Sequence, residues 1–502
     1  MADVLQNRAM LVLLLGSLCI GCTSQRTTLI ASPEGPNFIV VLADDLGYGD
    51  LGCYGNPAIR TPHLDRFAAE GVRFTQCYSA APVCSPARAG LLTGRTPYRA
   101  GVHGAIPWGS PMHLPAGEIT IAQLLRGRGY ATAQVGKWHL SGGFHLTDQP
   151  NPSDHGFDYW FSTQNNALPS HHNPDNFFRN GEPVGPLEGY AASIVVDEAI
   201  RWLGAVRDRR KPFLLYIGFH EPHEPIATDP RFAGLYDYPD NPSRAVYYGN
   251  VTQMDDAFGR LMASVDELGL RDNTLVLFTS DNGPARTPWH PHGSSGPLRE
   301  KKGHLYEGGI RVPGMIRWPG KANPGSVCDE PVSGVDLLPT VSQITGIAAP
   351  ADRPLDGASI VPVLRGRPVE RRVPLYWQYH DAPSAPKLAL RMRDWKMLAA
   401  LDDPRLKSAG NIRPEMYEAW RAVEPSGFEL YHLGADVGES RDLAAGESSR
   451  AREICDTLTR LYRQVRHESP TWPQFQDSRY ELQRITWPQY EPKSRPSVPT
   501  DP

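Results

Sequence analysis

The sequence predicts an α/β fold with a large mixed, mainly parallel sheet sandwiched by helices, plus a small C-terminal antiparallel sheet with one helix. Two observations predict it. Over the first three quarters of the chain, short apolar runs alternate with helical patterns, an order that is typical of parallel sheets covered on both faces. From about residue 369 onward, short candidate strands follow one another and a single helical pattern comes after them.

The individual elements follow from the apolar periodicity. Strands of the large sheet are predicted at Phe38–Ala43, Ala131–Val135, Phe213–Gly218 and Thr274–Thr279. Helices are predicted at His63–Phe74, Ile119–Arg128, Tyr190–Arg209 and Ala245–Leu268. The small sheet is predicted from Pro374–Tyr379, Leu388–Met392, Trp395–Ala399 and Phe428–Leu433, and its helix from Ser449–His467. This division gives a large domain at 36–368, an α+β subdomain at 369–468 and an irregular tail at 469–502.

Composition excludes some classes of protein. The 502 residues are 40% hydrophobic and 21% charged, which is ordinary for a globular protein. The formal net charge of -4 argues against a nucleic-acid partner, because nucleic-acid-binding proteins are usually basic.

The N-terminus predicts export. Arg8 precedes an apolar run, Ala9–Ile20, that is too short to span a bilayer comfortably, so residues 1–22 are predicted to be a signal peptide. Cys22 at its end is typical of a bacterial lipoprotein, although Cys19 stands where leucine is usual. Simple secretion and a buried first helix remain alternatives. A periplasmic or cell-surface location is expected, with a lipid at Cys22 as the sole membrane contact.

Seven cysteines are present, and two of them lie in the predicted signal peptide. An odd number in an exported chain leaves one cysteine unpaired or chemically special. No CxxC or Cys/His metal spacing occurs, so a zinc site made of thiolates is not expected. The remaining five are Cys53, Cys77, Cys84, Cys328 and Cys455.

Reactive side chains follow all four predicted strands of the large sheet. Ligands of open parallel sheets bind beyond the carboxyl ends of the strands, so these side chains are expected to converge on one site. They are Asp44 and Asp45, Lys137 and His139, His220 and His223, and Asp281 and Asn282. The four acidic and amide residues offer hard oxygen ligands, which suit Ca2+ or Mg2+. Ordinary turns after two strands are the alternative for each pair.

Cys84 lies at the start of a predicted helix. Ser85 can cap that helix, and Pro86 fits its first turn. Cys84 then lies at the positive end of the helix, where anions are favoured, and Arg88 is one turn further on. A capped helix with a buried cysteine is the alternative.

Cys84-Ser-Pro-Ala-Arg88, followed by Leu92-Thr-Gly-Arg95, resembles the signature of the formylglycine-dependent sulfatases. The resemblance covers residues 36 to 345 strongly and is looser in the C-terminal part, at Trp395-Lys396 and Glu429-Leu-Tyr-His-Leu433. The chain looks closest to the arylsulfatase A and N-acetylgalactosamine-6-sulfatase branch, which implies an alkaline phosphatase-like fold with 36–368 as the catalytic domain. Other matching segments begin at Asp44, Thr61, Gly136, His155, Ser280, Leu298 and Tyr306.

The resemblance implies a mechanism. A maturation enzyme converts Cys84 to formylglycine, whose hydrate attacks the sulfate ester and later expels sulfate as the aldehyde returns. The resemblance assigns Ca2+ to Asp44, Asp45, Asp281, Asn282 and the modified Cys84. It further implies that Arg88 orients the hydrated aldehyde, Lys137 and Lys302 bind sulfate, His139 acts as the base and His223 protonates the leaving alcohol.

Two of these choices rest on the family pattern. The segment Pro222-His-Glu-Pro225 selects His223 over His220, for which a packed histidine and a substrate contact both stay open. A lysine directly before glycine selects Lys302 over Lys301, although adjacent lysines are usually solvated surface.

The substrate expected from the resemblance is a sulfated carbohydrate. Two loops are candidates for the sugar site: Ser162–Val184, with Asn165, Asn166, His171 and His172, and Arg286–Ser295, with Trp289, His290 and His292. Plain polar surface loops are the alternative. Two other classes of protein also remain: a phosphatase or phosphodiesterase of the same superfamily, and a sulfated-glycan-binding protein without activity.

Overall fold

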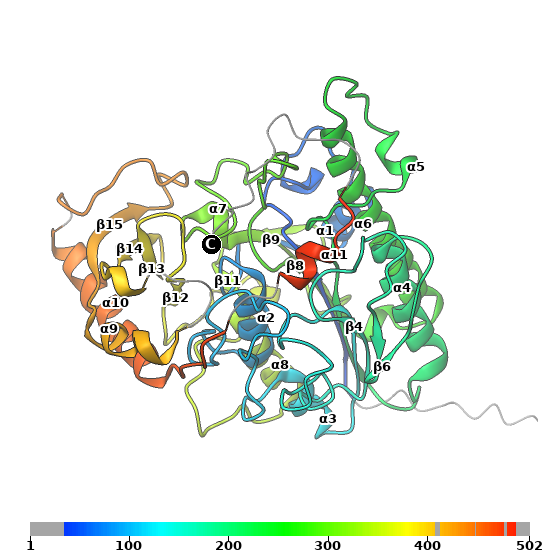
Figure 1. The fold of residues 1–502 in the computed structure, drawn as a ribbon, viewed down its shortest axis with the longest axis horizontal. Coiled ribbons are helices and arrows are strands. Elements are labelled where there is room, and N and C mark those ends of the chain that lie inside the picture. Colours follow the sequence, from blue (N-terminus) through cyan, green and yellow to red (C-terminus); the bar gives the residue numbers. More distant parts are fainter. Residues whose placement is uncertain (1–34, 407–411, 447, 476–478, 488–502) are drawn as a thin grey trace, which may run out of the picture.

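The computed structural model describes residues 35–406, 412–446, 448–475 and 479–487. The predicted signal peptide, 1–22, and Cys22 lie outside the described residues. Two bodies are visible in Figure 1, a large one that contains most of the chain and a smaller one built from its C-terminal part.

Among the described residues, eleven strands form the large sheet in the order β10-β2-β9-β8-β1-β7-β3-β4-β5-β6, with β11 paired to β2. The neighbours β8, β1, β7, β3 and β4 are all parallel, whereas β9 runs antiparallel to both β8 and β2. This arrangement confirms the predicted mixed, mainly parallel sheet. The bounds are β1 Asn37–Ala43, β2 Val72–Tyr78, β3 Ala131–Lys137, β4 Tyr159–Thr163, β5 Phe178–Arg179, β6 Glu182–Pro183, β7 Phe213–Gly218, β8 Thr274–Ser280, β9 Arg311–Arg317, β10 Ser326–Cys328 and β11 Val332–Ser333.

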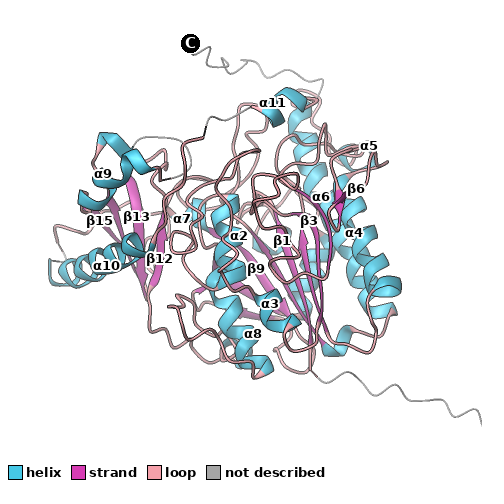
Figure 2. Cartoon of the chain, turned by 60° about the horizontal axis from the view of Figure 1, so that its bottom comes forward, coloured by secondary structure: helices cyan, strands magenta, loops and turns pink. Residues whose placement is uncertain are grey.

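Helices cover both faces of this sheet (Figure 2). Side chains of a strand alternate between the two faces of the sheet. Strand β1 has apolar side chains on both faces, so helices must cover both of them. Its Ile39 and Val41 join one apolar core, and its Phe38, Val40 and Leu42 join the other. The first core contains α1 (Pro62–Glu70), α4 (Ala191–Arg201) and α6 (Pro242–Glu267), and the second contains α2 (Cys84–Thr93), α3 (Ile121–Arg126) and α8 (Leu337–Thr345).

The small sheet is antiparallel, in the order β12-β13-β14-β15, as predicted. The long helix α10, Ser448–Glu468, packs on it through Ile454, Leu458 and Tyr462. A short helix, α9 (Tyr417–Ala422), adds Trp420 to the same core and was not predicted. The strands are β12 Leu375–Gln378, β13 Pro386–Met392, β14 Trp395–Ala400 and β15 Ser426–His432.

A buried ionic group joins the small sheet to the large domain. Lys396 of β14 lies 3.0 Å from Glu307, the first residue of α7 (Glu307–Ile310), and 2.7 Å from Glu439, and all three side chains are completely buried. Removing one partner from a buried ion pair costs roughly 3–5 kcal/mol, because the remaining charge is left unpaired. Trp377 adds a hydrogen bond of 2.7 Å from its ring nitrogen to the carbonyl of Ser79.

Two predicted helices extend well beyond the ends of the observed helices. The first predicted helix ends at Glu70, and after Gly71 the chain continues as β2, where Val72 and Phe74 are buried on alternate positions. Helix α4 ends at Arg201 and continues as one π-helical turn, Trp202–Val206. In both cases the local apolar pattern fits a longer helix as well as the observed continuation, and packing against the large sheet selects the observed one.

Within the predicted irregular tail, the structure describes a short helix, α11 (Tyr480–Arg484). None of the helices in the described part of the chain combines the length and apolar character needed to cross a membrane.

Candidate active site

The polar residues predicted to converge do so because their strands are direct neighbours. Strands β8, β1, β7 and β3 lie side by side and run parallel, so their carboxyl ends share one edge of the sheet. Asp44 and Asp45 follow β1, Asp281 and Asn282 follow β8, and Lys137 ends β3. Asp45 has a φ of 66°, a left-handed turn that a short polar residue tolerates.

Cys84 is the first residue of α2 and is buried against this edge. Its Sγ lies 3.6 Å from Oδ1 of Asp44. The predicted cap is wrong, since Ser85 lies inside the helix and its hydroxyl accepts a hydrogen bond of 3.1 Å from the Ile106 amide. Burial raises the pKa of the Cys84 thiol to about 12, so the unmodified side chain is a neutral thiol at neutral pH.

Arg88 lies one turn further along α2 and is fully buried. Its Nε and Nη2 donate to one carboxylate oxygen of Asp281, at 3.1 and 2.8 Å, and its Nη1 donates to the carbonyl of Lys137 at 3.0 Å. Burial alone would lower the pKa of Arg88, but Asp281 raises it above its ordinary value. Arg88 therefore fixes α2 to the ends of β8 and β3.

Each of the two aspartates after β1 pairs with a lysine. Lys137 donates to Asp44 at 2.6 Å, with both side chains completely buried. Burial opposes ionisation of Asp44, yet Lys137 and its other cationic neighbours hold its pKa well below the ordinary value. Lys302 lies 2.6 Å from Oδ1 of Asp45, whereas its neighbour Lys301 donates to the carbonyl of Arg286.

His223 and Lys302 form the exposed side of the site. The His223 side chain is 18% exposed and that of Lys302 is 21% exposed, whereas the other predicted site residues are all buried. Nε2 of His223 lies 3.7 Å from Oδ2 of Asp45. Burial lowers the pKa of His223 to about 4, so its ring is neutral at pH 7 in this state.

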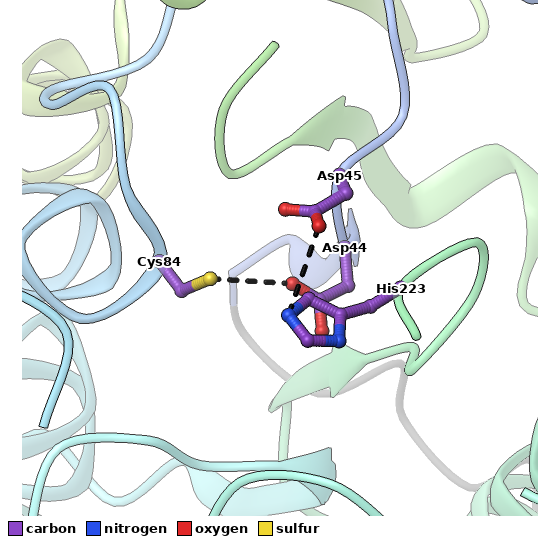
Figure 3. Close-up of side chains that lie close together, drawn as sticks. All are labelled: Asp44, Asp45, Cys84 and His223. Carbon is purple, nitrogen blue, oxygen red and sulfur yellow. Dashed lines mark hydrogen bonds and ion pairs between the residues drawn. The ribbon is translucent and has the colours of Figure 1, made fainter. Parts of the chain in front are cut away.

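The donor atoms at this edge fit a hard divalent cation. Side-chain ligand atoms of Asp44, Asp45, Cys84 and His223 all lie within 4.8 Å of one another (Figure 3). Asn282 donates its amide nitrogen to Asp45 at 2.7 Å, and its buried Oδ1 has no hydrogen-bond partner. An orphaned carbonyl oxygen beside a group of carboxylates is an arrangement that a bound cation would satisfy.

The other two predicted histidines, His139 and His220, are more deeply buried than His223. His139 has a φ of 58°, and its Nε2 lies 3.1 Å from the carbonyl of Ile106, while its Nδ1 has no partner. Burial, then Lys137, lowers the pKa of His139 well below its ordinary value. His220 is completely buried and lies 2.7 Å from the hydroxyl of Thr163, which favours the hydrogen-bonded alternative over a substrate contact.

The predicted sugar loops have mixed surroundings. In the first loop, His171 and Asn166 are buried, and both ring nitrogens of His171 lack a partner. In the second loop, His292 lies 2.8 Å from the Ser243 hydroxyl, and Trp289 stacks on Trp487. Trp487 belongs to the C-terminal tail, and its contact with this loop was not predicted. Two residues that stack on each other but lie almost 200 positions apart leave no local sequence pattern.

A mainly parallel sheet with buried carboxylates, lysines and a cysteine at its carboxyl edge is the arrangement expected of a hydrolase of the alkaline phosphatase-like class. The sulfatase family model matches residues 36–347, and a second model, described as N-sulphoglucosamine sulphohydrolase, C-terminal, matches 300–406. The chain therefore belongs to the sulfatase family, and the protein is a sulfatase.

Curated relatives cover most of the chain. It is 34% identical to mouse (Mus musculus) steryl-sulfatase over 85% of this chain and 81% of the relative. It is 33% identical to human arylsulfatase A, over 86% of this chain and 88% of the relative. It is 35% identical to N-acetylgalactosamine-6-sulfatase of the pig (Sus scrofa), over 90% of this chain and 88% of the relative. The predicted resemblance to the last two is confirmed.

A solved structure shows the same fold. Ps i-CgsB in complex with k-i-k-neocarrahexaose has a TM-score of 0.75 and is 26% identical in sequence, with 90% of this chain and 97% of the other covered. The predicted alkaline phosphatase-like fold is confirmed.

Proposed function

We propose that this sulfatase removes sulfate from a sulfated carbohydrate, with Cys84 converted to formylglycine and Ca2+ bound between the ends of β1 and β8. The observation that carries the proposal is the position of Cys84. It begins α2 inside the family signature, and its Sγ lies 3.6 Å from Asp44 at the edge where the carboxylates gather. Conversion of the thiol to the aldehyde is an oxidation, which a separate formylglycine-generating enzyme and its oxidant would carry out.

Charge balance supports both the cation and an anionic substrate. The three buried carboxylates of Asp44, Asp45 and Asp281 are matched by three cations, Arg88, Lys137 and Lys302. A bound calcium ion leaves this group with an excess of two positive charges. A sulfate monoester carries one negative charge and would reduce that excess, whereas a neutral ester would not.

The calcium ligands in this proposal are Asp44, Asp45, Asp281, Asn282 and the modified Cys84. When bound, the ion would polarise the sulfate oxygens and lower the proton affinity of the nucleophile. The hydrated aldehyde supplies a hydroxyl group as that nucleophile.

The other residues hold the ester and move protons. Lys137 and Lys302 neutralise charge on the sulfate oxygens, and Arg88 orients the residue at position 84 through its place on the same helix. His223, on the exposed side, protonates the leaving alcohol, and a bound sulfate ester favours the protonated ring by its negative charge. His139 takes the proton when the aldehyde returns.

A carbohydrate is favoured as substrate by the polar loops and by the relatives. Ps i-CgsB was solved in complex with k-i-k-neocarrahexaose, and one relative is named N-acetylgalactosamine-6-sulfatase. A phosphatase or phosphodiesterase is disfavoured by the family, and a binding protein without activity is disfavoured because every predicted catalytic residue is present. Export to a bacterial periplasm or cell surface, with or without a lipid at Cys22, stays a proposal from the sequence.

The mass of the peptide that contains Cys84 tests this function. In a host that matures such enzymes, the peptide is expected to have the mass of the aldehyde or of its hydrate, and the same preparation should hydrolyse 4-nitrophenyl sulfate. A free thiol or a disulfide at Cys84 in that host would contradict the mechanism. An intact aldehyde without hydrolysis of any sulfate ester would instead support the binding protein.

Calcium should stabilise the folded protein. After treatment with a chelator, a free calcium concentration 100 times the Kd is expected to add about 2.7 kcal/mol to the free energy of unfolding. The melting temperature then rises with added calcium. Asp45→Asn should abolish this rise, since it removes one charged ligand, while Asp352→Asn at an exposed position should retain it. A rise of equal size in Asp45→Asn would place the calcium elsewhere.

A further inference from the structure

Glu221 carries a completely buried carboxylate that has no role in the chemistry described above. Its Oε1 accepts a hydrogen bond of 2.8 Å from the amide of Ala192, and its Oε2 accepts one of 3.2 Å from the amide of His220. Burial raises the pKa of Glu221 to about 7, and in the described part of the chain the groups that oppose this rise are backbone amides. Burying a carboxylate among amides costs free energy, which indicates that its contacts serve a purpose other than stability.

The two amides that Glu221 binds belong to α4 and to the turn that carries His223. Ala192 is the second residue of α4, at the end of the helix where a negative charge is favoured. His220 begins the turn, and its carbonyl accepts a hydrogen bond of 2.9 Å from the amide of His223. The carboxylate therefore joins this turn to the start of α4.

The turn is also held from two other sides. The hydroxyl of Thr163 lies 2.7 Å from Nε2 of His220, and the amide of Asp44 donates to the backbone carbonyl of Glu221 at 3.0 Å. Neither contact involves the Glu221 side chain, so both can persist when that side chain is replaced. Loss of the carboxylate should therefore shift the turn without unfolding it.

The ring of His223 lies at the exposed end of the turn, where its Nε2 is 3.7 Å from Oδ2 of Asp45 (Figure 3). We propose that Glu221 is a positioning residue, whose carboxylate holds the turn 220–223 on α4 so that His223 can reach the oxygen of the leaving alcohol. Proton transfer needs about 2.6–3.2 Å between the two heavy atoms, and a displacement of about 1 Å can cost about 10²-fold in rate. This inference rests on the proposed function, because it concerns the general acid of that reaction.

A double-mutant cycle with His223→Ala tests this role. Glu221→Ala should lower kcat for a sulfated sugar by about 10²-fold, because the proton donor is displaced. The kcat for 4-nitrophenyl sulfate should fall far less, since its leaving group needs no proton. When position 223 is already alanine, the further change Glu221→Ala should alter kcat for the sugar ester by no more than about twofold, because residues that act through one group are not additive. Glu221→Gln keeps one oxygen as an acceptor and should recover part of the rate.

Glu198→Ala is the matched control. Glu198 is a buried carboxylate on the same helix, near its opposite end, where it pairs with Arg179 at 2.9 Å and with Arg201 at 2.7 Å. Its loss breaks both ion pairs and so perturbs α4 as well. The ratio of kcat for the sugar ester to kcat for the aryl ester should nevertheless stay as in the wild type.

Two kinetic results would overturn the proposal. One is an equal loss for the sugar ester and the aryl ester in Glu221→Ala. The other is a loss for the sugar ester that multiplies with the loss in His223→Ala. In either case the carboxylate would act on the fold or on the carboxylates after β1, and not through His223.

Hydrogen exchange gives a readout that does not need activity. The amides of Ala192, His220 and His223 should exchange faster in Glu221→Ala than in Glu198→Ala, because the turn has lost its anchor. Equal exchange in the two variants would contradict the anchoring. A wild type that carries the aldehyde and yet hydrolyses no sulfate ester would instead contradict the proposed function, and the exchange rates would still decide whether Glu221 anchors the turn.

Discussion

Replacement of Cys84 by alanine is expected to lower kcat/KM for sulfate esters by about 10⁴-fold or more, as seen when a nucleophile that acts with its partners is removed. Alanine cannot be converted to the aldehyde, and it offers no nucleophile. Arg88, Lys137 and Lys302 stay in place, so binding of the ester should change far less than turnover. Steady-state kinetics with 4-nitrophenyl sulfate measures the loss.

The control for this variant is Cys455→Ala on α10, which also removes a free, partly buried thiol but lies in the small C-terminal body. It should retain full activity. Both variants should melt within a few degrees of the wild type, because each change removes a single sulfur atom. Cys84→Ala that still turns over at the wild-type rate would rule out position 84 as the source of the nucleophile.

Replacement of His223 by alanine should affect esters according to their leaving group. A sugar alcohol is a poor leaving group and needs a proton, so its release should slow by about 10²–10⁴-fold, the usual contribution of a general acid. 4-Nitrophenolate leaves readily without a proton, so hydrolysis of its sulfate ester should slow by much less. The comparison requires kcat for 4-nitrophenyl sulfate and for a sulfated sugar that the wild type hydrolyses.

His467→Ala at the exposed end of α10 serves as the control and should leave both rates unchanged. An equal loss for both kinds of ester in His223→Ala would assign His223 to binding of the sulfate group and not to proton donation.

The convergence of the site could be predicted because the information is local. Each of four apolar runs ended in polar residues, and a parallel sheet brings such ends together whatever the length of chain between them. The order of the strands was not needed for this prediction. The roles of Cys84 and of Lys302, in contrast, came from the family signature, because a buried cysteine at a helix start has no chemistry that its sequence neighbours reveal.

The rest of the fold could not be predicted from local pattern. Strand β2 follows α1 after one glycine, so Val72 and Phe74 fit both a helical and an extended periodicity. The short strands β5 and β6 have two residues each, too few for an alternation to show. The pairing of Trp289 with Trp487 depends on the return of the tail across the large domain, which is set by tertiary packing alone.

The buried position of Lys396 between Glu307 and Glu439 has a consequence for how the protein unfolds. A chain cut after residue 368 would lose Lys396 and Glu439, leaving Glu307 with Arg311 as its remaining cationic partner in the large domain. Separation of the two bodies would therefore expose a core that is charged as well as apolar. We expect the two sheets to unfold in one cooperative transition, although their strands belong to separate ladders and their topologies differ.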